Sequence, residues 1–442
     1  MIIMKFGGAS IATADRIKNI TAIILREREH TPVVVLSAIG DTTDLLLDAS
    51  ERALDNFIGY SNIIDYHVQL CKELGIDPLI TEELLQEADT LLQGIALVGE
   101  MSPRVRDRLV SCGERLAVRI IAAYMRAQGF PAEAFDAWDI GMITNGVFGN
   151  ADVPESAYSV IRSRICSVCE YNSIPVITGF IGKDTKGEVT TLGRGGSDLS
   201  AAIIGAAIGA AEIQVWKDVD GILSADPRIV SYAQVVDAVS FDEAAELAYF
   251  GAQVLHPRAM HPARRHSIPI RVKNALNPDH PGTVISFHTD TDRIFKSVTC
   301  RRNITVIDIV SNRMLGQHGF LAEIFSVFDD MQISVDMITT SEVSVTLTLD
   351  NPHHIETLVR RLSEYAEVTV KTGKSLVSII GMMAHSSSIL EQVFRVLREQ
   401  NVTVDMMSLG ASKVNIGFVV NDDIVEQCVQ AVHAAFFEEA RV

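Results

Sequence analysis

Short apolar runs alternate with longer helical patterns through the first 290 or so residues, and this alternation is the strongest constraint on the fold. The runs rich in β-branched residues are 1–6, 32–38, 174–180, 212–219 and 268–274. Several are apolar throughout, as strands are when helices cover both faces of a parallel sheet. The pattern therefore predicts a mainly parallel α/β domain.

A stretch rich in Pro, Asn, Asp and Gly, residues 275–290, predicts a domain boundary, and a repeat follows it. Residues 320–350 and 389–419 align without gaps, and Asp336 and Asp405 fix the offset at 69 residues (405 − 336). Each copy reads strand, helix, strand, turn, strand, helix, which is the ferredoxin-like pattern. Two such units can pair their sheets or exchange strands, so their boundaries can interleave.

The length and charge of the chain narrow its class. A chain of 442 residues predicts two or three domains, because single cores rarely grow beyond roughly 250–300 residues. A formal charge of −18 argues against general affinity for nucleic acid or anionic membranes. The longest apolar run, 201–211, is too short to cross a bilayer, and no signal peptide is recognisable. We expect a cytoplasmic protein, or a stromal one if this is a processed plastid chain.

Cys166 and Cys169 form the one close pair among six cysteines. Without a second pair or nearby histidines, C-x-x-C is weak support for zinc, and we interpret the pair as buried thiols on one helix. The sequence predicts no protein metal site.

The segment that follows the first predicted strand combines a lysine with two glycines. Lys5 ends the strand, and Gly7, Gly8 and Ser10 precede a helix expected to start near Thr13. Backbone amides of such a turn and a helix N-terminus can bind phosphate oxygens. Because the lysine precedes the glycines, the segment matches neither a Walker loop nor a Rossmann fingerprint. On spacing alone, a plain tight turn explains it at least as well.

Residues 191–200, TLGRGGSDLS, place three glycines around Arg194. Ser197 or Asp198 can cap the helix that follows, and the arginine fork matches a carboxylate or phosphate. A turn accounts for the glycines and a helix cap accounts for one polar residue, but neither accounts for Arg194. The stretch therefore favours an anion site.

Three further stretches are ambiguous. Ser111 and Glu114 have the spacing of a capping box, which favours a helix start. Residues 216–228 follow a strand and read equally well as a turn or a nucleotide site. His256 precedes Pro257, a context that favours a helix end.

Taken together and in this order, these stretches resemble the aspartate kinases, members of the amino acid kinase family with C-terminal ACT domains. The resemblance spans essentially the whole chain and rests on segments 5–10, 111–114, 178–198, 216–228, 250–257 and 319–350. It implies an α/β amino acid kinase fold, a mainly parallel sheet between helices, over residues 1–290. Two ferredoxin-like βαββαβ ACT domains at 300–370 and 375–442 would follow.

The resemblance implies transfer of the γ-phosphoryl group of MgATP to the side-chain carboxylate of L-aspartate. The product is 4-phospho-L-aspartate, the first intermediate on the way to lysine, diaminopimelate, threonine and methionine. A carboxylate with a pKa near ~4 is ionised at pH 7, so the reaction needs positioning and electrostatics rather than a general base.

Three alternatives remain open. Another amino acid kinase is disfavoured by the tandem ACT repeat. A catalytically silent amino-acid sensor is disfavoured by Lys5, Glu114, Arg194 and Asp198. A fused homoserine dehydrogenase is not expected, because no dinucleotide-binding unit follows the second repeat.

Site residues follow from the resemblance. Lys5, Arg194 and Asp198 are the implied catalytic residues, with Asp198 orienting Lys5 or other substrate contacts. Arg194 would clamp the substrate α-carboxylate and Glu114 would receive its ammonium group. The implied aspartate-binding residues are Ser37, Thr43, Glu114, Arg194, Gly195, Gly196 and Ser197. The implied ATP-binding residues are Lys5, Gly7, Gly8, Lys217, Asp218, Leu223, Arg228, Gln253 and Val254, with Mg²⁺ held mainly by the nucleotide.

Three positions depart from the pattern common in bacterial relatives. This chain has Ala9, Lys217 and Gln253 where Thr, Thr and Lys are usual, and the last two look like the plant-type monofunctional branch.

The ACT repeats imply an amino-acid effector bound between paired units, with L-lysine as the inhibitor. The implied contacts are Met314, Phe320, Leu321, Val335, Asp336, Thr340, Ser341 and Glu342. On spacing alone, capping and turn chemistry explain Asp336 and Glu342 better. Pairing of ACT units implies a homodimer or a tetramer, in which the effector favours a state with a misaligned catalytic site.

Overall fold

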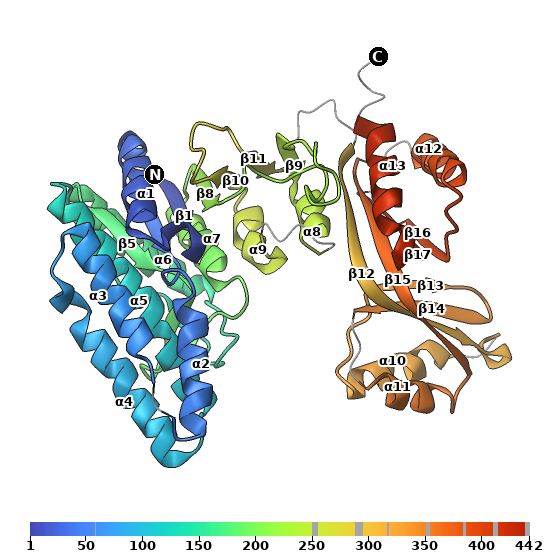
Figure 1. Ribbon diagram of the computed structural model, residues 1–442, viewed down its shortest axis with the longest axis horizontal. Coiled ribbons are helices and arrows are strands. Elements are labelled where there is room, and N and C mark those ends of the chain that lie inside the picture. The colour runs from blue at the N-terminus through green and yellow to red at the C-terminus, as the bar shows by residue number, and fades with distance from the viewer. Residues whose placement is uncertain are drawn as a thin grey trace. The chain divides into compact units, whose positions relative to one another are not determined.

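The computed structural model describes residues 1–57, 59–249, 255–287, 295–315, 318–350, 354–382, 386–409 and 414–437. The chain divides into two compact units (Figure 1). The first unit comprises Met1–Ile222, Asp237–Phe241 and Val254–Thr289, and the second comprises Leu223–Val236, Asp242–Gln253 and Asp290–Val442.

An eight-stranded sheet forms the centre of the first unit, in the order β3-β5-β2-β1-β8-β10-β11-β9. Its strands are β1 (Ile2–Phe6), β2 (Pro32–Leu36), β3 (Ala132–Phe135), β5 (Ile174–Thr178), β8 (Glu212–Lys217), β9 (Ala238–Ser240), β10 (Ile270–Asn274) and β11 (Thr283–Ser286). All neighbours are parallel except β10 and β11. The five predicted runs are β1, β2, β5, β8 and β10, so the mainly parallel sheet is confirmed.

Helices lie against both faces of this sheet, which is why β1, β2 and β5 are buried along their whole length. Ile2, Met4 and Phe6 of β1 share a core with helices α1, α3 and α5, whereas Ile3 faces Gly205 of α7. The helices are α1 (Ala14–Arg26), α2 (Thr42–Leu54), α3 (Ser61–Leu74), α4 (Glu82–Val98), α5 (Pro103–Ala127), α6 (Tyr158–Glu170), α7 (Gly196–Ile208) and α9 (Pro257–Arg265). A small second sheet joins β4 (Ile143–Thr144), β6 (Ile181–Asp184) and β7 (Val189–Thr191).

Local signals fix several helix ends. Thr13 caps α1 by accepting a hydrogen bond from the Arg16 amide, so the predicted start is confirmed. The expected helix end at His256 is wrong, because His256 is the N-cap of α9 and Pro257 takes the first position of that helix, where a missing amide hydrogen costs nothing. The capping-box interpretation of Ser111 and Glu114 is wrong, because both residues lie in the middle of α5. Cys166 and Cys169 lie on one helix, α6, as interpreted, but the expected burial is wrong, because both side chains are only partly buried.

The second unit is built on a six-stranded antiparallel sheet in the order β13-β14-β12-β15-β17-β16. Its strands are β12 (Phe295–Val310), β13 (Met337–Thr340), β14 (Ser344–Asp350), β15 (Glu367–Gly381), β16 (Met406–Leu409) and β17 (Asn415–Asn421). Its helices are α8 (Phe241–Tyr249), α10 (Phe320–Asp330), α11 (Ile355–Leu362), α12 (Ser386–Glu399) and α13 (Val425–Phe437). The element order matches the predicted ferredoxin-like repeat.

The two repeats share their longest strands. One half of β12, with Ile307 and Ile309, packs on α10 and α11, while Val298 in the other half packs on α12 and α13. Strand β15 pairs with β12 along most of its length, and Figure 1 shows these two strands running between the helix pairs. The sheet is therefore continuous through both repeats.

Within the described ranges, the structure contains no helix that is long and apolar enough to span a membrane.

Candidate active site

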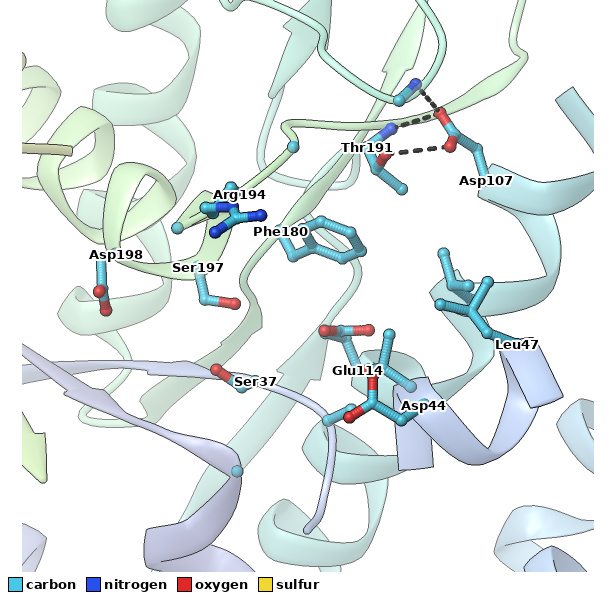
Figure 2. Close-up of a pocket in the computed structure, with 18 of the residues that line it drawn as sticks. Ser37, Asp44, Leu47, Asp107, Glu114, Phe180, Thr191, Arg194, Ser197 and Asp198 are labelled. Carbon is cyan, nitrogen blue, oxygen red and sulfur yellow. Dashed lines mark hydrogen bonds between the residues drawn. The ribbon is translucent and has the colours of Figure 1, made fainter. Parts of the chain in front are cut away.

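A polar pocket of about 650 Å³ opens at the carboxyl ends of β1 and β2 in the first unit. Adjacent parallel strands bring their ends to one edge of a sheet, which is where ligands bind in folds of this kind. Helices α2 and α5 and the segment from β7 to α7 complete the wall (Figure 2). All seven residues of the expected aspartate set line it, as do Lys5, Gly8 and Asp198.

Lys5 and Asp198 form an ion pair at the strand ends, with 2.6 Å between Nζ and Oδ1 and side chains 7% and 10% exposed. A pair this dry is held tightly, so Asp198 fixes the direction of the Lys5 ammonium. The alternative that Ser197 or Asp198 caps α7 is wrong, because the N-cap is Gly195 and no side chain bonds there. Lys217 lies in the same electrostatic environment: burial lowers its pKa, and Asp198 opposes that shift.

Gly8 brings the first predicted phosphate turn against the loop after β2. The Gly40 amide donates to the Gly8 carbonyl at 3.1 Å. A Cβ at Gly8 would lie 2.7 Å from the Gly40 oxygen and 2.8 Å from the Ala38 oxygen, so no side chain fits there. The turn therefore offers backbone rather than side chains to a ligand.

Glu114 projects from the middle of α5 into the pocket and is only 3% exposed. Burial raises its pKa to about 8, against the opposing effects of the Ala38 amide and the Lys5 charge. Among the described residues, no hydrogen-bond partner reaches its Oε2. A buried carboxyl in this state accommodates a cationic group that supplies the missing contacts.

Arg194 enters the pocket from the turn that precedes α7 (Figure 2). Its neighbours Gly193 and Gly195 have positive φ, and a Cβ at Gly195 would lie 2.7 Å from the His256 Cβ. Within the part of the chain that the structure describes, the guanidinium has no ion-pair partner. The Arg194 guanidinium is therefore available to an anion, which supports the sequence prediction of an anion site at this turn.

Several pocket residues escaped the sequence analysis, among them Asp44, Arg106, Asp107 and Phe180. Asp107 had a detectable signal, because it lies seven residues before Glu114 and hence on the same face of α5. Phe180 follows the buried strand β5 and gave no signal beyond ordinary apolar patterning.

Only some of the expected ATP-binding residues line the pocket. Lys5 and Gly8 line the pocket, and in the same unit Lys217 is the last residue of β8 and Asp218 follows it. Leu223 bridges Val235 within the second unit, where Arg228 is bound to Asp226 at 2.6 Å. Gln253 and Val254 lie outside the described residues.

Comparison with known proteins gives the family. The model of the amino acid kinase family matches residues 1–274, and an ACT domain model matches 307–362 and 377–436. Chloroplastic aspartokinase 1 of Arabidopsis thaliana is 49% identical over 457 residues, which cover 99% of this chain and 80% of that protein. The chain belongs to the aspartokinases of the amino acid kinase family.

Two solved structures of one aspartokinase match this chain over its length. E. coli aspartokinase III in complex with aspartate and ADP is 34% identical, with a TM-score of 0.81 over 99% of this chain and 100% of that one. The same enzyme in complex with lysine and aspartate has 34% identity and a TM-score of 0.80, over 99% of each chain. The predicted fold and resemblance are thus confirmed.

This aspartokinase transfers a phosphoryl group from ATP to the side-chain carboxylate of L-aspartate, in the first step of a route of amino-acid biosynthesis. The other amino acid kinases and the silent sensor considered above are not favoured by these relatives.

The aspartokinase's expected effector residues all lie in the second unit. Phe320 belongs to the core beneath α10 and α11, and Met314 and Val335 pack against it. Leu321 is exposed on α10, and Thr340 ends β13. Ser341 and Glu342 form the turn to β14, in which the Ser341 amide donates to the Ser344 carbonyl at 2.8 Å.

Asp336 is one of two acidic residues in this set, with Glu342, and one oxygen of its carboxylate accepts a hydrogen bond. The Tyr249 hydroxyl lies 2.5 Å from Oδ1, and Arg301 lies 4.0 Å away. Oδ2 is buried, with no hydrogen-bond partner in the part of the chain that the structure describes. Burial raises the pKa of Asp336, while Tyr249 and Arg301 oppose the shift.

Proposed function

We propose that Arg194 and Glu114 recognise the two charged groups on the α-carbon of L-aspartate. The supporting observation is that one pocket holds an arginine without an ion-pair partner among the described residues and a buried carboxyl with a free oxygen. An α-amino acid supplies the matching carboxylate and ammonium. Ser37, Thr43, Gly195, Gly196 and Ser197 complete the proposed aspartate site.

The side-chain carboxylate of aspartate, bound in this way, is directed to Lys5. We propose that Lys5, oriented by Asp198, stabilises the charge of the transferring phosphoryl group, assisted by the Gly7 and Gly8 amides. Lys5 and Lys217 both interact with Asp198, and this excess of positive charge suits a triphosphate that brings Mg²⁺ with it. MgATP is thus the substrate, and Mg²⁺ is held mainly by the phosphates.

We propose that the remaining contacts to the nucleotide come from residues at and beyond the end of β8. The proposed contacts are Lys217, Asp218, Leu223, Arg228, Gln253 and Val254. The domain limits proposed with this assignment are 1–290 for catalysis and 300–370 and 375–442 for the two ACT domains.

The second unit is proposed to bind L-lysine as a feedback inhibitor. Two observations support this: Asp336 has a buried oxygen without a partner, and an E. coli relative is known in complex with lysine and aspartate. The lysine ammonium would bind Asp336 and Glu342, with Met314, Phe320, Leu321, Val335, Thr340 and Ser341 around its stem. We propose a homodimer or tetramer paired through its ACT sheets, in which lysine favours a misaligned catalytic site.

The experiment is a turnover assay with MgATP and L-aspartate in which hydroxylamine traps the acyl phosphate. Lysine, threonine and S-adenosylmethionine are added separately at millimolar-scale concentrations. Hydroxamate formation that lysine alone suppresses supports both parts of the proposal. Turnover that lysine leaves unchanged contradicts the effector, and turnover that threonine suppresses instead reassigns it.

A further inference from the structure

We infer that Asp107 and Arg258 are positioning residues that hold the Gly193–Gly196 turn, and with it Arg194, in the geometry that binds the α-carboxylate of aspartate. The inference rests on the proposed role of Arg194. Neither residue was singled out by the sequence motifs.

The turn needs an external support. Gly193 and Gly195 have φ of 75° and 69°, and glycine-rich backbone loses more conformational entropy on ordering than any other kind. Arg194 is exposed and has no ion-pair partner in the described residues, so its own side chain does not fix the turn. The position of the turn therefore depends on the side chains that bind the backbone leading into it.

Asp107 holds the strand that leads into the turn. Its carboxylate is 2% exposed and accepts three hydrogen bonds. The Thr191 amide and the Gly149 amide each donate to Oδ2 at 2.8 Å, and the Thr191 hydroxyl donates to Oδ1 at 3.0 Å (Figure 2). Thr191 is the last residue of β7 and lies two positions before Gly193. Three donors on a buried carboxylate make a strong and directional anchor.

Arg258 holds the next residue of the same strand end, Leu192, together with the neighbouring loop. Its Nη1 donates to the Leu192 carbonyl at 2.8 Å, and its Nη2 donates to the Ala151 carbonyl at 2.8 Å. The same guanidinium also donates to the side chains of Asn150 and Asp152. Arg258 lies in the first turn of α9, directly after the His256 cap that approaches Gly195.

The two anchors meet in one loop. Asp107 binds Gly149, Arg258 binds the three residues that follow, and the Ala151 amide donates to the Thr191 carbonyl at 2.9 Å. Loop 149–152 is therefore clamped between α5 and α9, and it lies along the strand that carries the turn. Because Glu114 lies on the same helix as Asp107, α5 sets the distance between the two groups that bind aspartate.

The test compares Asp107→Ala, Asp107→Asn, Arg258→Ala and Arg258→Lys in steady-state kinetics, after thermal unfolding has shown that each is folded. Asp107→Ala and Arg258→Ala are expected to raise the KM for aspartate about tenfold or more, with the KM for ATP changed less than about threefold. Asp107→Asn should restore most of the affinity, because its oxygen can still accept both amides while the Thr191 hydroxyl turns to accept from its NH₂ group.

Arg265→Ala is the matched control, since Arg265 lies on the same helix, is 61% exposed and pairs only with Glu155 among the contacts described. It should leave both KM values unchanged. If Asp107→Ala does not fold, Thr191→Val replaces it, removing one of the three bonds and raising the KM for aspartate about threefold.

A double-mutant cycle with Arg194→Ala separates positioning from general stability. Adding Asp107→Ala to Arg194→Ala should raise the KM for aspartate little further. A further tenfold loss in that background, or equal effects on the KM values of both substrates, overturns the inference. If Arg194→Ala itself leaves the KM for aspartate unchanged, the proposed function fails instead.

Discussion

Glu114 shows at the scale of one residue how this pocket prepares for an amino acid. A carboxyl 3% exposed, with a pKa raised to about 8 and one oxygen without a partner, is mostly protonated at pH 7 in the free enzyme. An arriving ammonium supplies both charge and hydrogen bonds, and it therefore stabilises the ionised form. Binding of aspartate and ionisation of Glu114 are thus coupled.

This coupling predicts a pH dependence. The kcat/KM for aspartate should rise with pH and level off above about 8, as Glu114 ionises in the free enzyme. Glu114→Gln should lower kcat/KM by about 10²-fold and remove that rise, since no charge remains to titrate. A pH profile of both enzymes measures this, and a rise that persists in Glu114→Gln contradicts it.

The same shift predicts a stability effect. The folded-state pKa lies above the unfolded value of 4.5, so the unfolded state ionises first as pH rises. The free energy of unfolding should therefore fall between about pH 4.5 and pH 8. Glu114→Gln should lack that fall, and denaturant unfolding at pH 5 and pH 8 without ligands measures the difference. Equal pH dependence in the two proteins rules it out.

Lys5 gives a second prediction at this scale. Lys5→Ala should lower kcat by at least about 10²–10³-fold and leave the protein folded, because the ammonium is proposed to act on charge that develops in the transition state. Lys18→Ala, which removes an exposed lysine of α1 paired with Asp15, is the control and should retain full turnover. Substantial activity in Lys5→Ala would remove it from the proposed mechanism.

At the scale of an element, helix α7 begins with glycine where most helices begin with a capping side chain. Gly195 has φ of 69°, and no side chain bonds the first amides of the helix. An uncapped N-terminus keeps backbone donors and a positive dipole end available beside Arg194. The arrangement favours an anionic group at the start of the helix.

Gly195→Ala should therefore harm both stability and binding. A methyl group would meet the His256 Cβ at 2.7 Å and strain a left-handed backbone, so we expect a loss of about 1–3 kcal/mol in the free energy of unfolding and a raised KM for aspartate. Gly209→Ala at the other end of α7 is the matched control. It has φ of 64° but no atom within 4 Å of the added carbon, so it should lose stability alone. An unchanged KM in Gly195→Ala contradicts the prediction.

At the scale of the whole molecule, the sheet of the second unit brings two equivalent aspartates into different roles. Asp336 contacts Tyr249 and keeps one buried oxygen without a partner, whereas Asp405 forms an ion pair with Lys374 at 2.5 Å. The two aspartates are thus equivalent in sequence but differ in their contacts. Among the described residues, the Asp336 carboxylate keeps a buried oxygen without a hydrogen-bond partner, which is available to an effector ammonium.

Asp336→Asn should abolish inhibition by lysine, raising the inhibitory concentration at least about tenfold while turnover without lysine stays near the parent value. Asp405→Asn is the control at the equivalent position and should remain sensitive. Hydroxamate formation measured over a lysine titration distinguishes them. Equal lysine sensitivity in the parent and Asp336→Asn would place the effector elsewhere.

The buried strands of the first unit and the repeat of the second unit can be predicted from the sequence alone. Continuous apolar runs such as 32–38 and 174–180 specify strands buried on both faces, and the 69-residue offset places β13 and β16 at Met337 and Met406. The glycine-flanked Arg194 also signalled its site, because no turn or cap requires an arginine. These features depend on residues that are close together in the chain, so the pattern of the sequence predicts them.

Contacts between residues far apart in the chain follow only from the tertiary structure. The three bonds to Asp107 join segments 42 and 84 residues away along the chain, which no spacing rule reports. Segment 223–236 joins the second unit because Ala225 and Val230 pack into the core beneath α12 and α13. Ser111 and Glu114 have the spacing of a helix start, yet they lie in the middle of α5, because Ser102 already caps that helix and tertiary burial extends it. Packing between distant segments outweighs local preference, so these facts follow from the fold and not from the order of residues.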